Sequence, residues 1–358
     1  MPTSGSANQS SALRDDGDIA ILRGSEVRAV LAGRELEVIQ AVRMAYQTHG
    51  NGDSSLPHST FLRFPDQPRH RIIALPAYLG GECRIAGVKW VSSFPDNLKL
   101  GLDRASAVVI LSSPDTGRPE AVLEGSAISA KRTAASAALA AQCLLNGENV
   151  GRVGLIGCGV INFEIARFLL TVFPEVQTFV VFDKDEARAR QFDSKCQASF
   201  DGIEVEIAND VNAVLRDCLV VTLATTALAP HIHDLRDCAP GSAILHISLR
   251  DLSPEAILTS DNVVDDIDHV CRAETSVHLA EQRVGNREFI RCTLADILSG
   301  RAPARKDSES IAVFSPFGLG VLDLAVGKLV RDLAFQQGLE TVIDSFLPSP
   351  WAAEAKAL

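Results

Sequence analysis

Two glycines form the clearest chemical pattern in the sequence. Gly157 and Gly159 stand in the order Gly-x-Gly between an apolar run, residues 153–156, and a helix-like segment. In a strand–turn–helix unit the first glycine allows a tight turn and the second lets backbone amides approach a pyrophosphate, which the helix N-terminus also favours. We therefore expect the turn to bind a dinucleotide through six consecutive residues: Gly157, Cys158, Gly159, Val160, Ile161 and Asn162.

An aspartate favours this interpretation over a tight turn that binds no ligand. Asp183 directly follows the next apolar run, residues 179–182. A carboxylate there accepts hydrogen bonds from the ribose hydroxyls and repels a 2′-phosphate, so NAD is predicted rather than NADP. Lys184 and Arg188 lie nearby and could contact a phosphate instead, and Asn162 replaces the usual third glycine or alanine.

Three charged residues stand in apolar or small-residue surroundings, where an unpaired charge is costly. They are Lys89, Arg132 and Asp251. Asp251 follows a strand-like run, and loops at the carboxyl edge of a doubly wound sheet bind ligands, so an active-site carboxylate is predicted there. The structural alternatives are an exposed lysine on a half-buried strand, a snorkelling arginine and a helix-capping aspartate.

Two further polar clusters give less specific predictions. His231 and His233 could form a metal pair, but no third ligand lies nearby, so we expect a solvated or hydrogen-bonding role and predict no metal site. The acidic segment 265–269 is expected to be mainly a solvated loop. Three residues in and after it are candidates for the cofactor mouth or a dimer interface: His269, Glu274 and His278.

These residues need elements to position them, and the apolar runs predict which. From residue 151 to about 270, short apolar runs alternate with helix-like segments, as in a parallel sheet with crossover helices. The expected strands are 153–156, 179–182, 219–223, 243–247 and 263–264, and the expected helices are 163–173, 186–200 and 208–216. Before them, 69–79, 84–94 and 106–113 are strand-like. The predicted fold class is α/β, a Rossmann-type doubly wound parallel sheet plus an α+β substrate and dimerisation domain.

The chain of 358 residues predicts about two domains. We expect a disordered tail over 1–15, a substrate-binding and dimerisation domain from 16–130 with 315–358, and an NAD-binding domain over 131–314. The Rossmann strands are expected to finish by about residue 310. A helix over 320–335 should then return to the first domain.

Composition excludes two classes of partner. With 34 Lys plus Arg against 45 Asp plus Glu, the net charge of −11 argues against electrostatic nucleic-acid binding. The longest charge-free apolar stretch, 133–147, is too short for a membrane span. The eight cysteines show no CxxC spacing and the N-terminus lacks the pattern of a secretory signal, so we expect a cytoplasmic protein without disulfides.

Longer motifs carry a family resemblance. GVKWVSSFP, TGRPEAVLEG, SAKRTAASAALAA, LIGCGVI, VVFD and SPFGLGVLDLAVGKLV, in this order, resemble the ornithine cyclodeaminase/mu-crystallin family over about residues 20–345. LPHSTFLRF, SFPDN, DRASAVVIL, NFEIARF and ISLRDLSPE resemble its branch that releases 2,3-diaminopropionate for siderophores or peptide antibiotics.

The resemblance implies roles residue by residue. Lys89 and Arg132 would hold the substrate carboxylate, and Lys89 would also take part in catalysis. Asp251 would be the catalytic acid/base. Further positions would contact the cofactor: Arg104, Thr225, Ser248, Leu249, Arg250 and Ser315. The family resemblance also implies a homodimer.

Three departures from the cyclodeaminases point to a changed substrate. The proline-linked arginine is missing around Pro57, a threonine is replaced by Arg104, and the GGDxPGK loop reads LRDLSP from Leu249. A substrate with more carboxylates than ornithine fits these changes. Four residues are candidates to bind the additional polar groups of such a substrate: His58, Ser59, Arg63 and Arg71. Of these, Ser59 and Arg71 are predicted to bind it.

The resemblance thus implies an NAD-dependent dehydrogenase for a small amino-acid substrate. It would oxidise an N-substituted glutamate to an imine and hydrolyse the imine to 2-oxoglutarate and 2,3-diaminopropionate. The alternatives are an ornithine cyclodeaminase or ketimine reductase, and a non-catalytic, crystallin-like binding protein.

Overall fold

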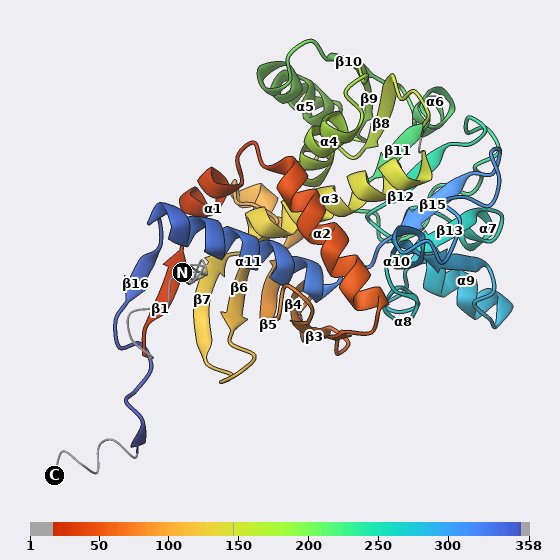
Figure 1. The fold of residues 1–358 in the computed structure, drawn as a ribbon. Helices are drawn as coiled ribbons and strands as arrows, with labels where there is room; N and C mark the ends of the chain where they lie inside the picture. The colour runs from red at the N-terminus through yellow and green to blue at the C-terminus, as the bar shows by residue number, and fades with distance from the viewer. Residues whose placement is uncertain (1–16, 146, 352–358) are drawn as a thin grey trace, which may run out of the picture.

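The computed structural model describes residues 17–145 and 147–351. The tail expected over 1–15 lies outside the described residues. Two eight-stranded sheets form the two halves of the molecule, with the second sheet above the first in Figure 1. No helix in the described ranges combines the length and apolar character needed to cross a membrane.

The first sheet is largely antiparallel, with strand order β16-β1-β7-β6-β5-β4-β2 and β3 on the outside of β4. The strand-like runs expected near residues 69–113 coincide with β4, β5 and β6. The eight strands are β1 (Ile19–Leu22), β2 (Ser54–Ser55), β3 (Thr60–Phe64), β4 (Gln67–Leu79), β5 (Ile85–Ser93), β6 (Ala105–Ser112), β7 (Pro119–Glu124) and β16 (Thr341–Ile343). A 3-10 helix, η1 (Pro95–Leu100), follows β5.

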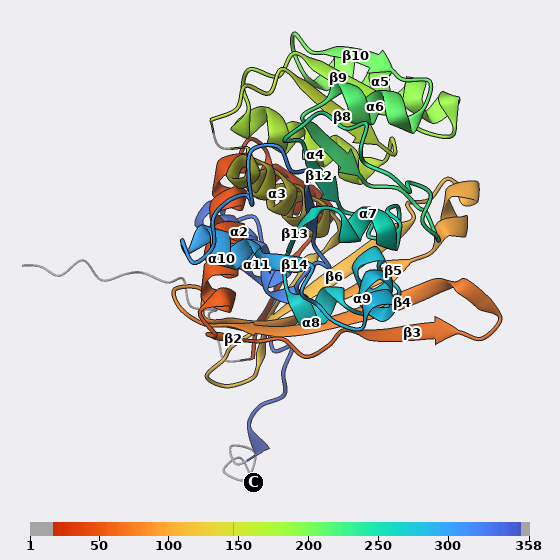
Figure 2. The same cartoon turned by 90° about the vertical axis from the view of Figure 1, so that its right-hand side faces the viewer.

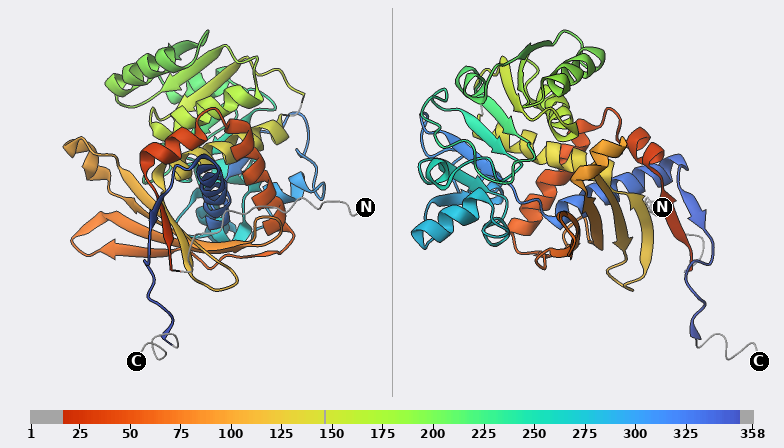
Figure 3. Two further views of the ribbon diagram at one scale, coloured as in Figure 1. Left: turned by 60° about the vertical axis from the view of Figure 1, so that its left-hand side comes forward. Right: turned by 180° about the vertical axis from the view of Figure 1, so that it is seen from behind.

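Helices cover one face of this sheet, as Figures 1 and 3 show. They are α1 (Gly24–Leu31), α2 (Glu35–Gly50), α3 (Ser126–Leu144) and α11 (Gly320–Gln337). α11 packs across β4, β5 and β6. Its close approach needs a glycine on β5, because a Cβ atom at Gly87 would stand 2.9 Å from Leu324 and 2.2 Å from the carbonyl oxygen of Ile110.

The second sheet is parallel throughout, with strand order β10-β9-β8-β11-β12-β15-β13-β14. Its strands are β8 (Arg152–Ile156), β9 (Thr178–Phe182), β10 (Glu204–Ile207), β11 (Val220–Leu223), β12 (Ala243–His246), β13 (Asp261–Val264), β14 (Ile290–Thr293) and β15 (Ala312–Ser315). The connecting helices are α4 (Val160–Val172), α5 (Glu186–Ser199), α6 (Val211–Asp217), α7 (Pro254–Leu258), α8 (Ile267–Val270), α9 (Ser276–Val284) and α10 (Leu294–Leu298). The predicted α/β fold class is confirmed.

The order of the strands fixes where a ligand should bind. The chain runs outward from β8 through β9 to β10 and then returns to β11 on the other side of β8. The strand order therefore reverses between β8 and β11. In doubly wound sheets, the crevice beyond the carboxyl ends of the strands at such a reversal is the usual ligand site.

One expectation about the sheet is wrong. The strands do not finish by about residue 310, because β15 pairs with both β12 and β13 inside the sheet. β15 is only four residues long and follows a polar segment, so its sequence signal is weak. The strands that it pairs with, β12 and β13, are also distant from it in the sequence. The expected domain boundaries fall inside α3, between residues 130 and 131, and before the last residue of β15, between 314 and 315.

Candidate active site

The Gly-x-Gly turn lies at the reversal, between β8 and α4. Gly157 has a positive φ of 94°, and a Cβ atom there would stand 2.6 Å from the carbonyl oxygen of Ala224, so only glycine fits. Gly159 caps α4 without any side-chain hydrogen bond, and a Cβ atom there would meet nothing within 4 Å. The amides at the start of α4 are therefore open to an anion.

Two polar side chains hold this turn. Asn162 is fully buried, and its amide nitrogen donates to the carbonyl oxygens of Ile156 at 2.9 Å and Gly157 at 2.8 Å. Its oxygen accepts from the hydroxyl of Thr222. Asp183 directly follows β9, and its carboxylate accepts from the backbone N–H of Cys158 at 2.8 Å. Asn162 of α4 and Asp183 after β9 therefore both fix the backbone of the turn.

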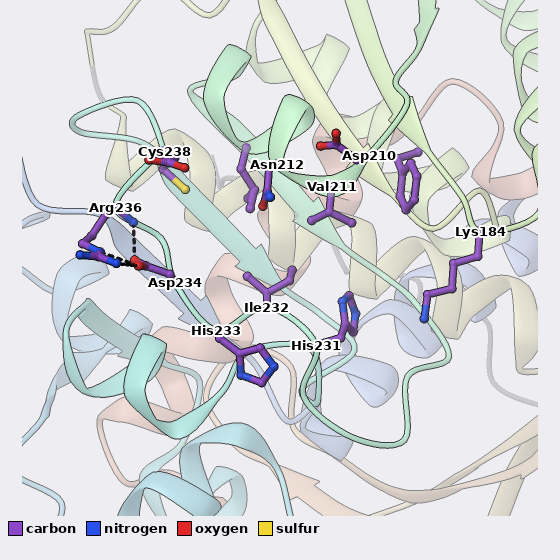
Figure 4. A pocket seen from close by; sticks show the side chains of 13 residues that line it. Lys184, Asp210, Val211, Asn212, His231, Ile232, His233, Asp234, Arg236 and Cys238 are labelled. Atoms are coloured by element: carbon purple, nitrogen blue, oxygen red, sulfur yellow. Dashed lines mark hydrogen bonds and ion pairs between the residues drawn. The ribbon is translucent and has the colours of Figure 1, made fainter.

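A cleft of about 770 Å³ opens beside the end of β9 (Figure 4). One wall is formed by Phe182 and Lys184 at the end of β9, and another by residues at the start of α6. The third wall is the segment 231–238, which passes close to Asp251 because the backbone N–H groups of His231 and Ile232 both donate to the carbonyl oxygen of Asp251 at 2.9 Å. The volume of the cleft is in the range of small-molecule binding sites.

The first sheet contributes a buried charge cluster. Lys89 on β5 and Arg132 on α3 both contact Asp323 of α11, with Lys89 Nζ 2.7 Å from Oδ2 and Arg132 Nε 2.9 Å from Oδ1. Asp323 is completely buried, and Lys89 is 2% exposed. The cluster holds two cations against one carboxylate and so carries one net positive charge.

The electrostatics of Lys89 follow from its burial. Burial and the positive charge of Arg132 lower the pKa of Lys89 to about 8, against the opposing influence of Asp323. Its ammonium group also donates to the hydroxyl of Ser129 at 3.2 Å. Lys89 thus remains mostly charged at neutral pH and becomes neutral in mildly alkaline solution.

The loop 315–318 lies against this cluster. A Cβ atom at Gly318 would stand 2.9 Å from Nη1 of Arg132. Asp265 fixes the loop by accepting from the backbone N–H of Phe317 at 2.9 Å and of Gly318 at 2.7 Å. Asp265 is 1% exposed, so the expectation of a mainly solvated acidic segment is wrong for this residue. Asp268, whose side chain is 75% exposed, does face solvent.

A second polar cluster surrounds Asp251, at the carboxyl ends of β11 and β12. The hydroxyls of Thr225 and Ser248 donate to its two carboxylate oxygens, and Nε2 of His231 lies 3.0 Å from Oδ1. Burial by itself would raise the pKa of Asp251, but His246 and the two hydroxyls hold it below its usual range. Asp251 is therefore ionised at neutral pH.

The loop 315–318 joins the two clusters. Ser315, at its start, lies with its hydroxyl 3.2 Å from Nδ1 of His246, whose Nε2 lies 3.2 Å from the backbone nitrogen and 3.6 Å from Oδ2 of Asp251. Gly318, at its end, contacts Arg132. The loop therefore contacts Arg132 directly and is linked to Asp251 through His246.

The remaining predicted residues lie around these clusters. Ser59 is 8% exposed, its hydroxyl has no hydrogen-bond partner among the described residues, and it shares a small cavity with His269 and Gly318. Leu249 is buried with a positive φ of 65°. Arg250 is half-buried and donates to the carbonyl oxygen of Ala273 at 2.6 Å. Arg71 and Arg104 are also half-buried.

Sequence reasoning missed two residues of the site and undervalued a third. Asp323 and His246 are fully buried and were not singled out. Asp323 carried the same signal as Lys89, since it is a lone charge within the apolar run GVLDLAVG. His231 was given only a solvated or hydrogen-bonding role, and the hydrogen-bonding role is confirmed by its contact with Asp251.

Comparison with known proteins places this chain among enzymes that act on amino acids and imino acids. N-((2S)-2-amino-2-carboxyethyl)-L-glutamate dehydrogenase of Staphylococcus aureus is 28% identical over 335 residues, covering 92% of this chain and 99% of that protein. The structure of Thermococcus litoralis Δ1-pyrroline-2-carboxylate reductase with NADH and L-proline superposes with a TM-score of 0.84 at 26% identity, covering 90% of this chain and 99% of the other.

An archaeal alanine dehydrogenase, solved as a dimer with bound NAD, superposes with a TM-score of 0.81 at 27% identity, covering 91% of this chain and 99% of the other. The family model that describes ornithine cyclodeaminases and mu-crystallins matches residues 20–338. This match covers every residue of the two clusters, all of the second sheet, and the first sheet except β16 and the first residue of β1. The chain therefore belongs to the ornithine cyclodeaminase/mu-crystallin family.

Proposed function

We propose that this protein is an NAD-dependent dehydrogenase that cleaves N-(2-amino-2-carboxyethyl)-L-glutamate. The substrate, NAD⁺ and water would give 2-oxoglutarate, 2,3-diaminopropionate, NADH and a proton. The observation that carries the proposal is the loop 315–318, which borders Arg132 of the buried Lys89–Arg132 pair and His246 of the cluster around Asp251. A carboxylate clamp and a proton-handling group are the two parts that oxidation of an amino acid requires.

The residues of the turn fit a dinucleotide. The open amides after Gly159 suit the pyrophosphate, Asp183 suits the adenosine ribose, and the adjoining cleft offers room for the adenosine. When bound, NAD supplies the hydride acceptor. The nearby relatives whose structures contain NADH or NAD support this assignment.

Lys89 and Arg132 would hold the carboxylate beside the carbon that loses its hydride. Two buried cations give charge-assisted hydrogen bonds that fix the orientation of that carbon. Asp323 sets the direction of both side chains, because each is tied to one of its oxygens. Loss of hydride leaves a C=N bond, which water can attack.

Proton transfer would be shared by Asp251 and His231. Asp251 is a weak base because its pKa lies below the usual range, and its carboxylate is enclosed. Histidine is the side chain that exchanges protons near neutrality. If Nε2–H of His231 donates to Asp251, Nδ1 is left to accept a proton from the amine or from the attacking water. The side chain of His231 is 24% exposed and so can pass that proton on.

The choice of substrate rests on the Staphylococcus aureus relative and on the arginines that replace cyclodeaminase residues. Ornithine carries one carboxylate, whereas the proposed substrate carries three. The half-buried Arg71, Arg104 and Arg250 provide cations beyond the Lys89–Arg132 pair. In the cell, the diaminopropionate would serve siderophore or peptide antibiotic synthesis.

The test is product analysis by mass spectrometry after incubation of the protein with NAD⁺ and N-(2-amino-2-carboxyethyl)-L-glutamate. We expect 2-oxoglutarate and 2,3-diaminopropionate in equal amounts, with lasting absorbance of NADH at about 340 nm. Asp251→Asn, which keeps the shape of the side chain, should retain cofactor binding and lose most turnover. Cyclisation of ornithine without lasting NADH would instead favour a cyclodeaminase, and NAD binding without turnover of any amino or imino acid would favour a binding protein.

The bare face of the first sheet supports a homodimer. In the described part of the chain, no helix covers the face opposite α11 (Figure 3). That face carries Trp90, which is 43% exposed, and its cross-strand neighbours Ala74 and Val108. Val88 and Ile110 pair on the same face. An apolar sheet face of this kind is typical of a contact between subunits, and the archaeal alanine dehydrogenase was solved as a dimer.

A further inference from the structure

We propose that Arg71, Arg104 and Arg250, with Arg63 at the rim, form a second anion site that binds a distal carboxylate of the substrate. The site would select amino acids whose substituents carry an acid group remote from the oxidised carbon. This inference rests on the proposed function, because it assigns one end of the same substrate.

Three segments bring these arginines together. Arg71 on β4 is the direct cross-strand partner of Arg63 on β3 and of Ser93 on β5. Arg104 stands just before β6, where its carbonyl oxygen accepts from the backbone N–H of Phe94, the residue after Ser93. Arg250 comes from the loop after β12 in the other half of the molecule. Figure 2 shows the β3–β4 hairpin reaching out on the side of α7 and α9, which follow that loop.

The positive charges of these side chains repel one another. Burial lowers the pKa of the Arg71 guanidinium, and the charges of Arg250, Arg104 and Arg63 lower it further. Like charges placed directly across a strand pair destabilise a sheet. A protein with a net charge of −11 therefore gathers four cations at one place, and this arrangement needs a reason.

No carboxylate of the described residues lies within ion-pairing distance of these arginines. None of the four arginines forms an ion pair within 4 Å, although the described chain holds many such pairs elsewhere. Nε of Arg71 is buried and has no hydrogen-bond partner in that part of the chain. Arg250 uses one nitrogen on the carbonyl oxygen of Ala273, and the nearby Glu274 is exposed. The cluster is thus a preformed set of donors with no ion-paired carboxylate in the described part of the chain, which is the arrangement that recognises a carboxylate.

The position of the cluster suits the far end of the substrate. Arg71 and Lys89 lie on the same face of the first sheet, because Arg71 pairs with Ser93, and Leu75 pairs with Lys89. Four residues of extended strand separate the two positions, or about 13 Å between Cα atoms. Long side chains that converge from these positions can hold two carboxylates of one small molecule. With its α-carboxylate on Lys89 and Arg132, the glutamate derivative would direct another carboxylate toward Arg71.

A cofactor phosphate is the other anion that could occupy the cluster, and binding measurements separate the two. Protein loaded with NADH cannot oxidise the amine, so its affinity for substrate analogues can be measured by calorimetry without turnover. The probes are N-(2-amino-2-carboxyethyl)-L-glutamate, the corresponding glutamine derivative, which replaces the side-chain carboxylate by an amide, and N-(2-aminoethyl)-L-glutamate, which lacks the outer carboxylate. The protein should bind the triacid roughly 10- to 100-fold more tightly than at least one of the two diacids.

Three variants test whether the preference for the triacid depends on Arg71. Arg71→Met should reduce the preference to less than about threefold, whereas Arg71→Lys, which keeps the charge, should retain part of it. Arg118→Met is the matched control, since it removes one arginine from the turn at the other end of β6 and should leave the preference unchanged. Because Arg71 has no ionic partner, Arg71→Met should melt at or above the temperature of the unaltered protein.

Equal binding of all three compounds by the unaltered protein would overturn the inference. The inference would also be overturned if Arg71→Met bound NADH more weakly but kept its full preference for the triacid. That result would assign the cluster to the cofactor. A preference for the triacid without formation of 2-oxoglutarate in the NAD⁺ assay would overturn the proposed function alone. Formation of 2-oxoglutarate without any preference would overturn this inference alone.

Discussion

The depressed pKa of Lys89 predicts how ligand binding depends on pH. A carboxylate binds the charged ammonium form, and the pKa of about 8 in the free protein means that this form is lost as the pH rises. The charged-to-neutral ratio is about 10 to 1 at pH 7 and about 1 to 10 at pH 9. The dissociation constant for a carboxylate ligand should therefore rise about tenfold over this interval, with one proton taken up on binding at the upper end.

The proposed product 2-oxoglutarate is the appropriate ligand, because it has no group that titrates between pH 7 and 9. Calorimetric titration of the NADH-loaded protein in amine-free buffers gives both the dissociation constant and the proton uptake. Lys89→Arg serves as the control, since a guanidinium stays charged throughout and its affinity should not vary. A constant affinity in the unaltered protein, or the same variation in Lys89→Arg, would refute the assignment of Lys89 to the carboxylate clamp.

Three further predictions address separate parts of the structure. Asp323→Asn should lower the free energy of unfolding by about 3–5 kcal/mol in chemical denaturation, because it leaves Lys89 and Arg132 buried without a counter-ion; a loss below about 1 kcal/mol would contradict this. Asp183→Ser should shift the preference in steady-state assays from NAD toward NADP by roughly tenfold or more, since it removes the charge that repels a 2′-phosphate; an unchanged preference would separate Asp183 from the ribose. Trp90→Lys should convert a dimer to a monomer in analytical ultracentrifugation, because it places a charge in the bare sheet face; a persistent dimer would place the interface elsewhere.

The nucleotide half could be predicted well because its determinants are local. The turn around Gly157, the aspartate after β9 and the buried strands each carry their signal within a few residues. β15 was missed because four residues of a central strand differ little from an apolar stretch of a loop. Asn162 counted as a departure from the glycine pattern, and its role became visible only with its hydrogen bonds to Ile156 and Gly157.

The charged site could be predicted only in part because its partners are far apart in sequence. Lys89 and Arg132 stood out as charges in apolar surroundings, but their bond to Asp323 joins β5, α3 and α11 and depends on how α11 packs across the first sheet. Arg71, Arg104 and Arg250 appeared as separate residues, some assigned to substrate and some to cofactor. Their convergence depends on the β-sheet register and on the placement of one half of the molecule against the other.

The central claim is that the carbon beside the Lys89–Arg132 clamp is the one that loses its hydride. It can be tested with N-(2-amino-2-carboxyethyl)-L-glutamate that carries deuterium at the α-carbon of the glutamate part. Mass spectrometry of the reduced cofactor should then show NADH one mass unit heavier, together with unlabelled 2-oxoglutarate. Unlabelled NADH with deuterium retained in the amino-acid product would show that another carbon is oxidised and would contradict the account.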